Sequence, residues 1–241
     1  MMVCNIAGYQ FCSLENLPTL QLRFKQWCAE LGLKGTVLLS PEGINIMLAG
    51  VQEAIDSFKA LLKSDERFSP LSFKESWSSS LPFKRLLVKI KKEAVTMGVA
   101  EIHAEQGRAV SLLPNDLKRW LDEGRDFTLL DVRNHYEVEY GTFENAVELG
   151  LRHFREFPQA VKQHLEVWKQ KPLVMFCTGG IRCEKAGLLL EELGLKEVYQ
   201  LDGGILNYFS ACQGAYFEGD CFVFDERVTL DKHLKPTNNT I

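Results

Sequence analysis

The sequence predicts an α/β protein with two domains in series, a ferredoxin-like α+β domain at residues 1–92 and an α/β domain at 113–227. Strand and helix patterns in the first ninety residues follow the order βαββαβ, with one extra strand at the end. From Leu113 short apolar strands alternate with helices, which is typical of a mostly parallel sheet covered by helices on both faces. Residues 93–112 show no clear periodicity and are predicted to be a linker.

The first half of the ferredoxin-like domain is assigned from the spacing of its apolar residues. Residues 3–11 have the composition of a strand, and a helix opens at Pro18. The apolar side chains of that helix fall on one face: Leu20, Phe24, Trp27, Cys28 and Leu31. Two β-rich runs, 36–39 and 44–48, follow, and the Ser-Pro-Glu-Gly segment at 40–43 that joins them is a strong turn signal.

The second half of this domain continues with helical spacing at residues 51–63, where apolar residues again recur every three or four positions. Two further strands are predicted at 71–77 and 85–90. These elements complete the βαββαβ order and supply the extra strand.

The second domain is assigned in the same way. A helix capped by Asn115 or Asp116 is predicted to run to Asp122. The further predicted elements are strands at 128–132, 173–176 and 197–201 and helices at 153–168, 181–193 and from 203 onwards. A short strand is predicted within the linker at 101–104, and residues 228–241 are predicted to be a C-terminal tail.

Composition limits the class of protein. The chain has 241 residues, of which 46% are hydrophobic, enough to build a sizeable core, and a net charge of −4 that provides no global field for nucleic acid. No apolar run approaches the roughly 18 residues of a membrane helix, and the N-terminus lacks the pattern of a secretory signal. Seven cysteines without a Cys-x-x-Cys pair argue against a disulfide scaffold or zinc ribbon. We therefore expect a soluble, cytoplasmic protein.

The strongest chemical signal is the loop at residues 177–182. A buried strand delivers Cys177 to the carboxyl edge of the sheet, Gly179 and Gly180 let the backbone curl round the sulfur, and a helix then begins. The free N–H groups of that helix and the charge of Arg182 favour thiolate over thiol, which predicts a lowered pKa and a nucleophile at neutral pH. The alternative is a buried cysteine before an incidental Gly-Gly turn.

These residues carry a resemblance to a known domain. Leu130-Asp-Val-Arg-Asn134 with Glu137, Gly141 to Ala146, the 177–182 loop and Leu201-Asp-Gly-Gly-Ile205 together resemble a rhodanese domain, a three-layer α/β fold. The six residues from Cys177 to Arg182 match the loop that holds a persulfide in sulfurtransferases. The related dual-specificity phosphatases use one residue more, so a phosphatase is disfavoured.

The resemblance extends over nearly the whole chain. Gly35 to Asn45, Cys177 to Lys185 and Gly219 to Arg227 resemble the rhodanese-domain tRNA uridine hydroxylases, although longer members continue past this point with a cysteine-bearing tail. This resemblance implies oxygen-dependent 5-hydroxylation of the wobble uridine, with tRNA as partner and molecular oxygen as co-substrate. Cys177 would be catalytic, and Thr178, Gly179, Gly180, Ile181 and Arg182 would form the active-site loop. The alternative is a sulfurtransferase in which Cys177 carries a persulfide received from a donor such as thiosulfate or a protein.

Three residues near this loop could have either a functional or a purely structural role. Asp131 and Arg133 lie at the end of a predicted strand, where they either support the loop or contact substrate, or simply form a structural ion pair. Cys183 either resolves an oxidised or persulfidic Cys177 as a disulfide or packs against the sheet.

No cofactor can be identified from the sequence. Three His-x-Glu pairs match the start of a non-haem iron site, at His103, His135 and His164, but so many matches among five histidines show that the pattern is unspecific. No Gly-x-Gly-x-x-Gly follows a strand, so a Rossmann-type flavin or nicotinamide site is unsupported, and no metal site is predicted.

The best candidate for RNA contact is a basic strand in the first domain. Its cationic residues are Lys84, Arg85, Lys89 and Lys91. Strand alternation puts Arg85, Lys89 and Lys91 opposite the apolar Leu86, Val88 and Ile90. This face either contacts a tRNA backbone or protects an edge strand from aggregation.

Overall fold

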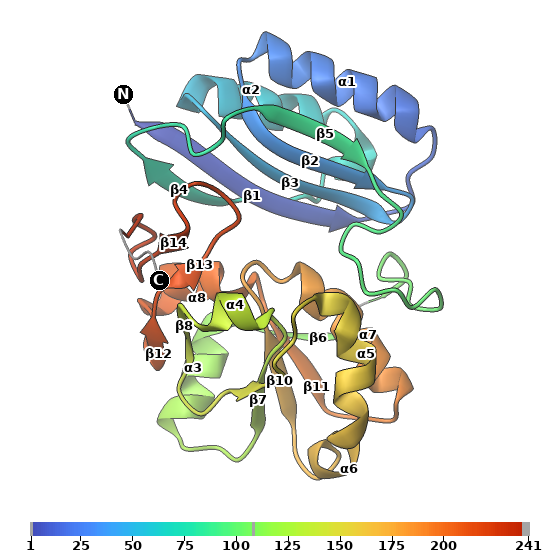
Figure 1. Ribbon diagram of the computed structural model, residues 1–241, viewed down its shortest axis with the longest axis vertical. Coiled ribbons are helices and arrows are strands. Elements are labelled where there is room, and N and C mark those ends of the chain that lie inside the picture. The colour runs from blue at the N-terminus through green and yellow to red at the C-terminus, as the bar shows by residue number, and fades with distance from the viewer. Residues whose placement is uncertain (1, 108, 238–241) are drawn as a thin grey trace. The chain divides into compact units, whose positions relative to one another are not determined.

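The computed structural model describes residues 2–107 and 109–237, and the chain divides into two compact units, Met1–Ala94 and Val95–Ile241. Each unit contains a five-stranded sheet. Helices pack beside the sheets in both units (Figure 1). The predicted fold class, a ferredoxin-like α+β unit followed by an α/β unit with a parallel sheet, is confirmed.

The helices of the first unit lie on one face of its sheet (Figure 1). Its strands, in spatial order, are β4 (Lys74–Ser78), β1 (Val3–Phe11), β3 (Gly43–Gly50), β2 (Lys34–Ser40) and β5 (Leu86–Ile90). The helices are α1 (Leu17–Glu30) and α2 (Gln52–Lys63), and a 3-10 turn covers Glu66–Phe68. The central strands pair antiparallel, whereas the additional β5 pairs parallel to β2 and forms an edge of the sheet.

The helices of the first unit bury the faces that their spacing predicts. Leu20, Phe24 and Cys28 of α1 are buried. The Phe24 ring makes edge-to-face contacts with Phe58 of α2 and with Phe68, an arrangement that aromatic rings prefer. These contacts close the core beneath the sheet.

The second unit is built on a parallel sheet. Its strands, in spatial order, are β6 (Val110–Leu112), β11 (Val198–Leu201), β10 (Leu173–Phe176), β7 (Thr128–Asp131) and β9 (Val147–Glu148). Two small antiparallel pairs are added, β8 (Gly141–Phe143) with β12 (Phe217–Gly219) and β13 (Cys221–Phe222) with β14 (Thr229–Leu230). The helices are α3 (Pro114–Asp122), α4 (His135–Val138), α5 (Phe157–Ala160), α6 (Leu165–Trp168), α7 (Ile181–Glu192) and α8 (Gly204–Cys212).

Alternate strand residues of this sheet enter two separate hydrophobic cores. Leu130 and Met175 pack on the side of α5 and α7, while Leu129 and Phe176 pack on the side of α3 and α8. Helices therefore cover both faces, as predicted for a parallel sheet. Within the described part of the chain, no helix has the length and apolar character needed to cross a membrane.

The structure differs from the prediction of a linker at 93–112. From Val95 the described residues belong to the second unit, and Met97, Ile102 and Ala109 are buried in one of its cores. No strand forms at 101–104, and the strand in this region is β6, at the edge of the sheet. The segment packs as an irregular chain, so its buried residues have no period that sequence analysis could detect.

Two predicted helix boundaries are also wrong. The helix expected at 153–168 is a series of short turns, 3-10 at Phe154–Glu156 and Val161–Gln163 and α-helical at α5 and α6. Pro158 has no N–H to continue a helix and lies at the start of α5. Neither Asn115 nor Asp116 caps α3; Leu113 is the N-cap and Pro114 occupies the first turn, where its missing N–H costs nothing.

The predicted C-terminal tail is folded in part. β14 pairs with β13, and Leu230 is buried in the second core. Residues 238–241 of the predicted tail lie outside the described residues. The β13–β14 pair could not be predicted, because the turn at 225–228 has no periodic pattern of apolar residues.

Burial of Ile102 gives a direct test of the place of this segment in the second unit. Ile102 is 3% exposed, so Ile102→Ala should lower the free energy of unfolding by about 2–5 kcal/mol. Val167→Ala, at a residue 66% exposed, should change it by less than about 0.5 kcal/mol. Urea unfolding of the full chain measures both values, and equal effects of the two substitutions would contradict the burial.

Candidate active site

Cys177 emerges at the carboxyl edge of the parallel sheet. β10 ends at Phe176, which lies opposite Asp131 at the end of β7, and the Val132 N–H donates to the Phe176 carbonyl at 3.1 Å. Cys177 therefore starts the loop beside the end of a neighbouring strand, which is where open α/β sheets place their ligands.

The 177–182 loop wraps its backbone around the sulfur. Gly180 has φ of 102°, a conformation that favours glycine, and it is the N-cap of α7. Its N–H donates to the Cys177 Sγ at 3.1 Å, and the backbone N–H of Arg182 also donates to this sulfur. The loop and the first turn of α7 therefore present backbone donors to Cys177.

The Cys177 sulfur is charged at neutral pH. Burial alone would raise its pKa, since the side chain is fully enclosed. A hydrogen bond from the Cys183 thiol, the positive charge of Arg182 and the N–H groups of Arg182 and Gly180 outweigh burial and lower the pKa to about 5. The structure thus supports the thiolate that the sequence predicts.

Arg182 is held in place by Glu137. Its Nη1 donates to Glu137 Oε2 at 2.5 Å and its Nη2 donates to Oε1 at 2.7 Å, and both side chains are almost completely buried. Burial would raise the pKa of Glu137, but the charge and hydrogen bonds of Arg182 lower it. Thr178 adds a hydroxyl donor to Glu137 Oε1 at 3.4 Å.

Glu137 was not singled out as a site residue, although it belongs to the motif that resembles rhodaneses. It lies in α4, and its carboxylate also accepts from the Asn134 N–H at 3.1 Å in a capping box. The Asn-x-x-Glu spacing at 134–137 is the sequence signal that could have identified this cap.

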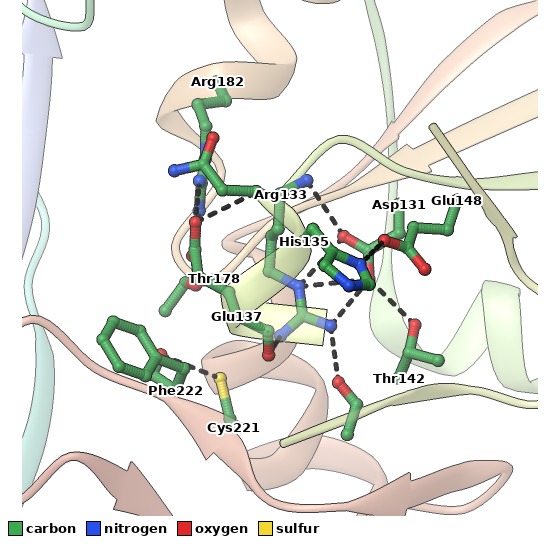
Figure 2. Close-up of polar contacts among 12 residues, drawn as sticks. Asp131, Arg133, His135, Glu137, Thr142, Glu148, Thr178, Arg182, Cys221 and Phe222 are labelled. Atoms are coloured by element: carbon green, nitrogen blue, oxygen red, sulfur yellow. Dashed lines mark hydrogen bonds and ion pairs between the residues drawn. The ribbon is translucent and has the colours of Figure 1, made fainter. Parts of the chain in front are cut away.

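Asp131 and Arg133 form a buried ion pair. Arg133 Nη2 lies 2.6 Å from Asp131 Oδ2, and neither side chain is exposed. Arg133 also donates to the carbonyls of Glu137 and Gly141, at 3.3 and 2.6 Å, and Thr142 donates to Asp131 at 2.8 Å (Figure 2). These contacts connect the end of β7 to α4 and β8, as in the alternative that assigns Asp131 and Arg133 to a structural ion pair.

Two further cysteines lie near Cys177. Burial and the neighbouring Cys177 charge raise the pKa of Cys183, so it stays a thiol and donates to Cys177. Cys221, which sequence analysis did not select, is buried, and burial raises its pKa to about 12 although Arg133 acts against this. Cys177 is therefore the thiolate among these three buried sulfurs.

Gly204, in the late Gly-Gly segment, supports the loop from α8. Ile205 N–H donates to the Cys177 carbonyl at 3.0 Å, and Leu206 N–H donates to the Thr178 carbonyl at 3.1 Å. Gly204 has φ of +67°, and a Cβ there would lie 2.4 Å from the Cys177 carbonyl oxygen. This contact requires glycine, which gives a physical reason for the motif.

The predicted RNA-binding residues are not in this unit. Lys84, Arg85, Lys89 and Lys91 are exposed in the first unit, on and around the edge strand β5. Arg85 and Lys89 share their side of the strand with Leu87, and Ile90, predicted on the packed side, is 39% exposed. Both earlier readings, phosphate contact and edge protection, are compatible with this position.

The three His-x-Glu pairs are used in separate contacts. His103 pairs with Glu105 at 3.3 Å, and His135 Nδ1 lies 2.5 Å from Glu148 Oε1, while Glu137 pairs with Arg182. His164 stacks on Trp168. Over residues 2–107 and 109–237, no group of three or more His, Cys, Asp or Glu side chains is arranged to hold a metal ion.

Comparison with known proteins adds independent information. Residues 3–94 match the family described as a UPF0176 acylphosphatase like domain, and residues 113–211 match the rhodanese-like domain. The chain is 52% identical over 241 residues to the tRNA uridine(34) hydroxylase of Cupriavidus taiwanensis, covering 98% of this chain and 86% of that protein. Proteins of the same name from Ralstonia nicotianae and Bordetella petrii are 51% and 49% identical, and the matches cover 98% and 97% of this chain and 86% and 95% of theirs.

The lowered pKa of Cys177 predicts a titration far from that of an ordinary thiol. The difference in ultraviolet thiolate absorbance between wild type and Cys177→Ser should appear in one step at a pH of about 5. Because the folded protein releases this proton at a lower pH than the unfolded chain, stability gained from Cys177 is complete above pH 9 and is lost as pH falls through 5. A step near pH 9 would contradict the thiolate.

The close contact at Gly204 predicts a substitution that disturbs the loop through its backbone. Gly204→Ala should destabilise the protein by more than the roughly 1–2 kcal/mol of a left-handed alanine, and should raise the pKa of Cys177. Gly150→Ala is the matched control, because Gly150 has φ of +62° but open space around its Cα. Urea unfolding and thiolate absorbance measure the two effects; equal values for both variants would exclude the contact.

Proposed function

The chain belongs to the family of tRNA uridine(34) hydroxylases, and on that premise we propose that it hydroxylates the wobble uridine of tRNA at carbon 5 with Cys177 as nucleophile. The proposal is supported by relatives of about 50% identity over nearly the full chain. Molecular oxygen is the co-substrate in this proposal: one of its atoms enters carbon 5 of the uridine, and the other leaves as water with two electrons and two protons from an external two-electron reductant. The cytoplasm, where tRNA is modified, is the expected location.

One observation carries the role of Cys177, its charged sulfur at the carboxyl edge of the sheet. Uracil is electron-poor at carbon 6, and a thiolate that adds there makes carbon 5 electron-rich, which is the carbon to be hydroxylated. A thiol would need a separate base, whereas a pKa of about 5 supplies the reactive form at neutral pH. In this proposal Thr178, Gly179, Gly180, Ile181 and Arg182 form the active-site loop, which is supported by the backbone N–H groups of Gly180 and Arg182 that donate to the sulfur.

Binding of tRNA is assigned in part to the basic strand of the first unit. Lys84, Arg85, Lys89 and Lys91 are exposed cations that can neutralise phosphates of the RNA backbone. Because such contacts release counterions, tRNA affinity should fall steeply as salt is raised. The net charge of −4 makes a local cluster of this kind necessary.

The function is tested by nucleoside mass spectrometry. Unmodified tRNA is incubated in air with the purified full chain and a two-electron reductant, with a thiol and a reduced nicotinamide tested in parallel. Transfer RNA is also isolated from cells that lack the gene and carry wild type or Cys177→Ala. We expect 5-hydroxyuridine from wild type and at least a 100-fold loss with Cys177→Ala, as for removal of a nucleophile. Hydroxylation by Cys177→Ala would disprove the role of this residue, and its absence with wild type would disprove the function.

Sulfur transfer through a Cys177 persulfide is the second candidate. The six-residue loop with backbone donors aimed at the sulfur, including Gly180 N–H at 3.1 Å, favours it. Transfer of sulfur from thiosulfate to cyanide by the same preparation, with no change in the tRNA nucleosides, would support this function over hydroxylation. Its sulfur would come from a small donor or from a donor protein.

A further inference from the structure

Four aromatic side chains gather at one place in the second unit: Tyr136, Tyr140, Phe222 and Phe224, here called the aromatic cluster. Phe222 is the common neighbour, with ring centroids 5.4 Å from Tyr136, 5.5 Å from Tyr140 and 5.2 Å from Phe224. Phe224 is 46% exposed and Tyr136 is 40% exposed. Among the described residues, three aromatic side chains are at least 40% exposed. Two of them belong to the cluster, and the third is Trp77 of the first unit.

The rings of the cluster are held by a short, well-anchored turn. Val223, between Phe222 and Phe224, is buried, so the two flanking residues point to the opposite side of the chain. The Val223 N–H donates to the Val228 carbonyl at 2.8 Å. The turn between them is closed by the ion pair of Asp225 and Arg227, 2.6 Å apart. An exposed apolar surface that the backbone holds in place is typical of a binding site.

The cluster is continuous with the candidate active site. The Arg182 guanidinium carbon lies 5.9 Å from the centre of the Phe224 ring. Tyr136 precedes Glu137, the partner of Arg182, and Phe222 follows Cys221, whose pKa responds to the Cys177 charge. α4, which carries Tyr136, packs against β13, which carries Phe222 (Figures 1 and 2). A molecule that reaches the 177–182 loop over this side therefore meets the rings.

We propose that the aromatic cluster is a stacking platform for the unpaired bases that flank the target uridine in the anticodon loop. This inference rests on the proposed function. A base must leave its stack to approach a sulfur that is fully enclosed, and aromatic rings beside Arg182 of the loop replace the stacking that is lost. Every base has a π face, so rings of this kind bind single-stranded RNA with little dependence on sequence. The platform positions the RNA, while the chemistry stays with Cys177.

The test compares matched substitutions in the full chain with an anticodon stem-loop as substrate. Phe224→Leu keeps an apolar side chain but removes the π face, and Phe224→Trp restores one. We expect Phe224→Leu to raise KM roughly 5- to 150-fold, the range that stacking of one base supplies, while Phe224→Trp stays near wild type. Trp77→Leu, the same kind of change at an exposed ring of the first unit, should leave KM unchanged.

A fluorescent base separates stacking from a merely structural effect. With 2-aminopurine beside position 34, binding should quench the fluorescence for wild type and Phe224→Trp but much less for Phe224→Leu. If Phe224→Leu and Tyr136→Leu leave KM and the quenching unchanged, the aromatic cluster is not a stacking platform. Contact with a protein partner would then explain the exposed rings. An equal loss in Trp77→Leu would also overturn the platform. Because quenching needs no hydroxylation, failure of the wild-type reaction disproves the proposed function without deciding this inference.

Discussion

A charged sulfur away from water is unstable unless donors and opposite charge surround it, and the second unit provides both at Cys177. The loop and the first turn of α7 contribute backbone N–H groups, and Cys183 contributes a thiol donor. Arg182 contributes the opposite charge, and Glu137 fixes its guanidinium in a bidentate pair. Removing any one of these leaves a buried charge with fewer partners, which explains why so many polar groups are buried at this edge of the sheet.

The remaining structure of the second unit keeps these groups in register. The ion pair of Asp131 and Arg133 ties the end of β7 to α4, so the strand that neighbours β10 also positions the helix that carries Glu137. From the other side, α8 donates to the carbonyls of the loop, and Gly204 allows the close approach that this requires. The Cys177 loop is thus bound on both sides by elements that are distant in the sequence.

Sequence patterns predicted the elements that are recognisable from the spacing of neighbouring residues. The βαββαβ order, the parallel sheet and the strand–loop–helix around Cys177 all follow from periodicity and turn residues. Glu137 and Gly204 were not selected as site residues, because their importance depends on which loop they meet in space. The linker prediction is wrong for a related reason: Met97 and Ile102 are buried in an irregular segment whose apolar residues have no period.

The pH dependence of hydroxylation in a Cys183→Ala variant tests the central claim, that the Cys177 thiolate performs the reaction. Loss of the Cys183 donor should raise the pKa of Cys177, and the acidic limb of kcat/KM reports ionisations of the free enzyme. We expect this limb at a pH of about 5 in wild type, and we expect it to move upward in Cys183→Ala by the same amount as the thiolate absorbance. An acidic limb that stays in place while the absorbance moves would contradict this claim.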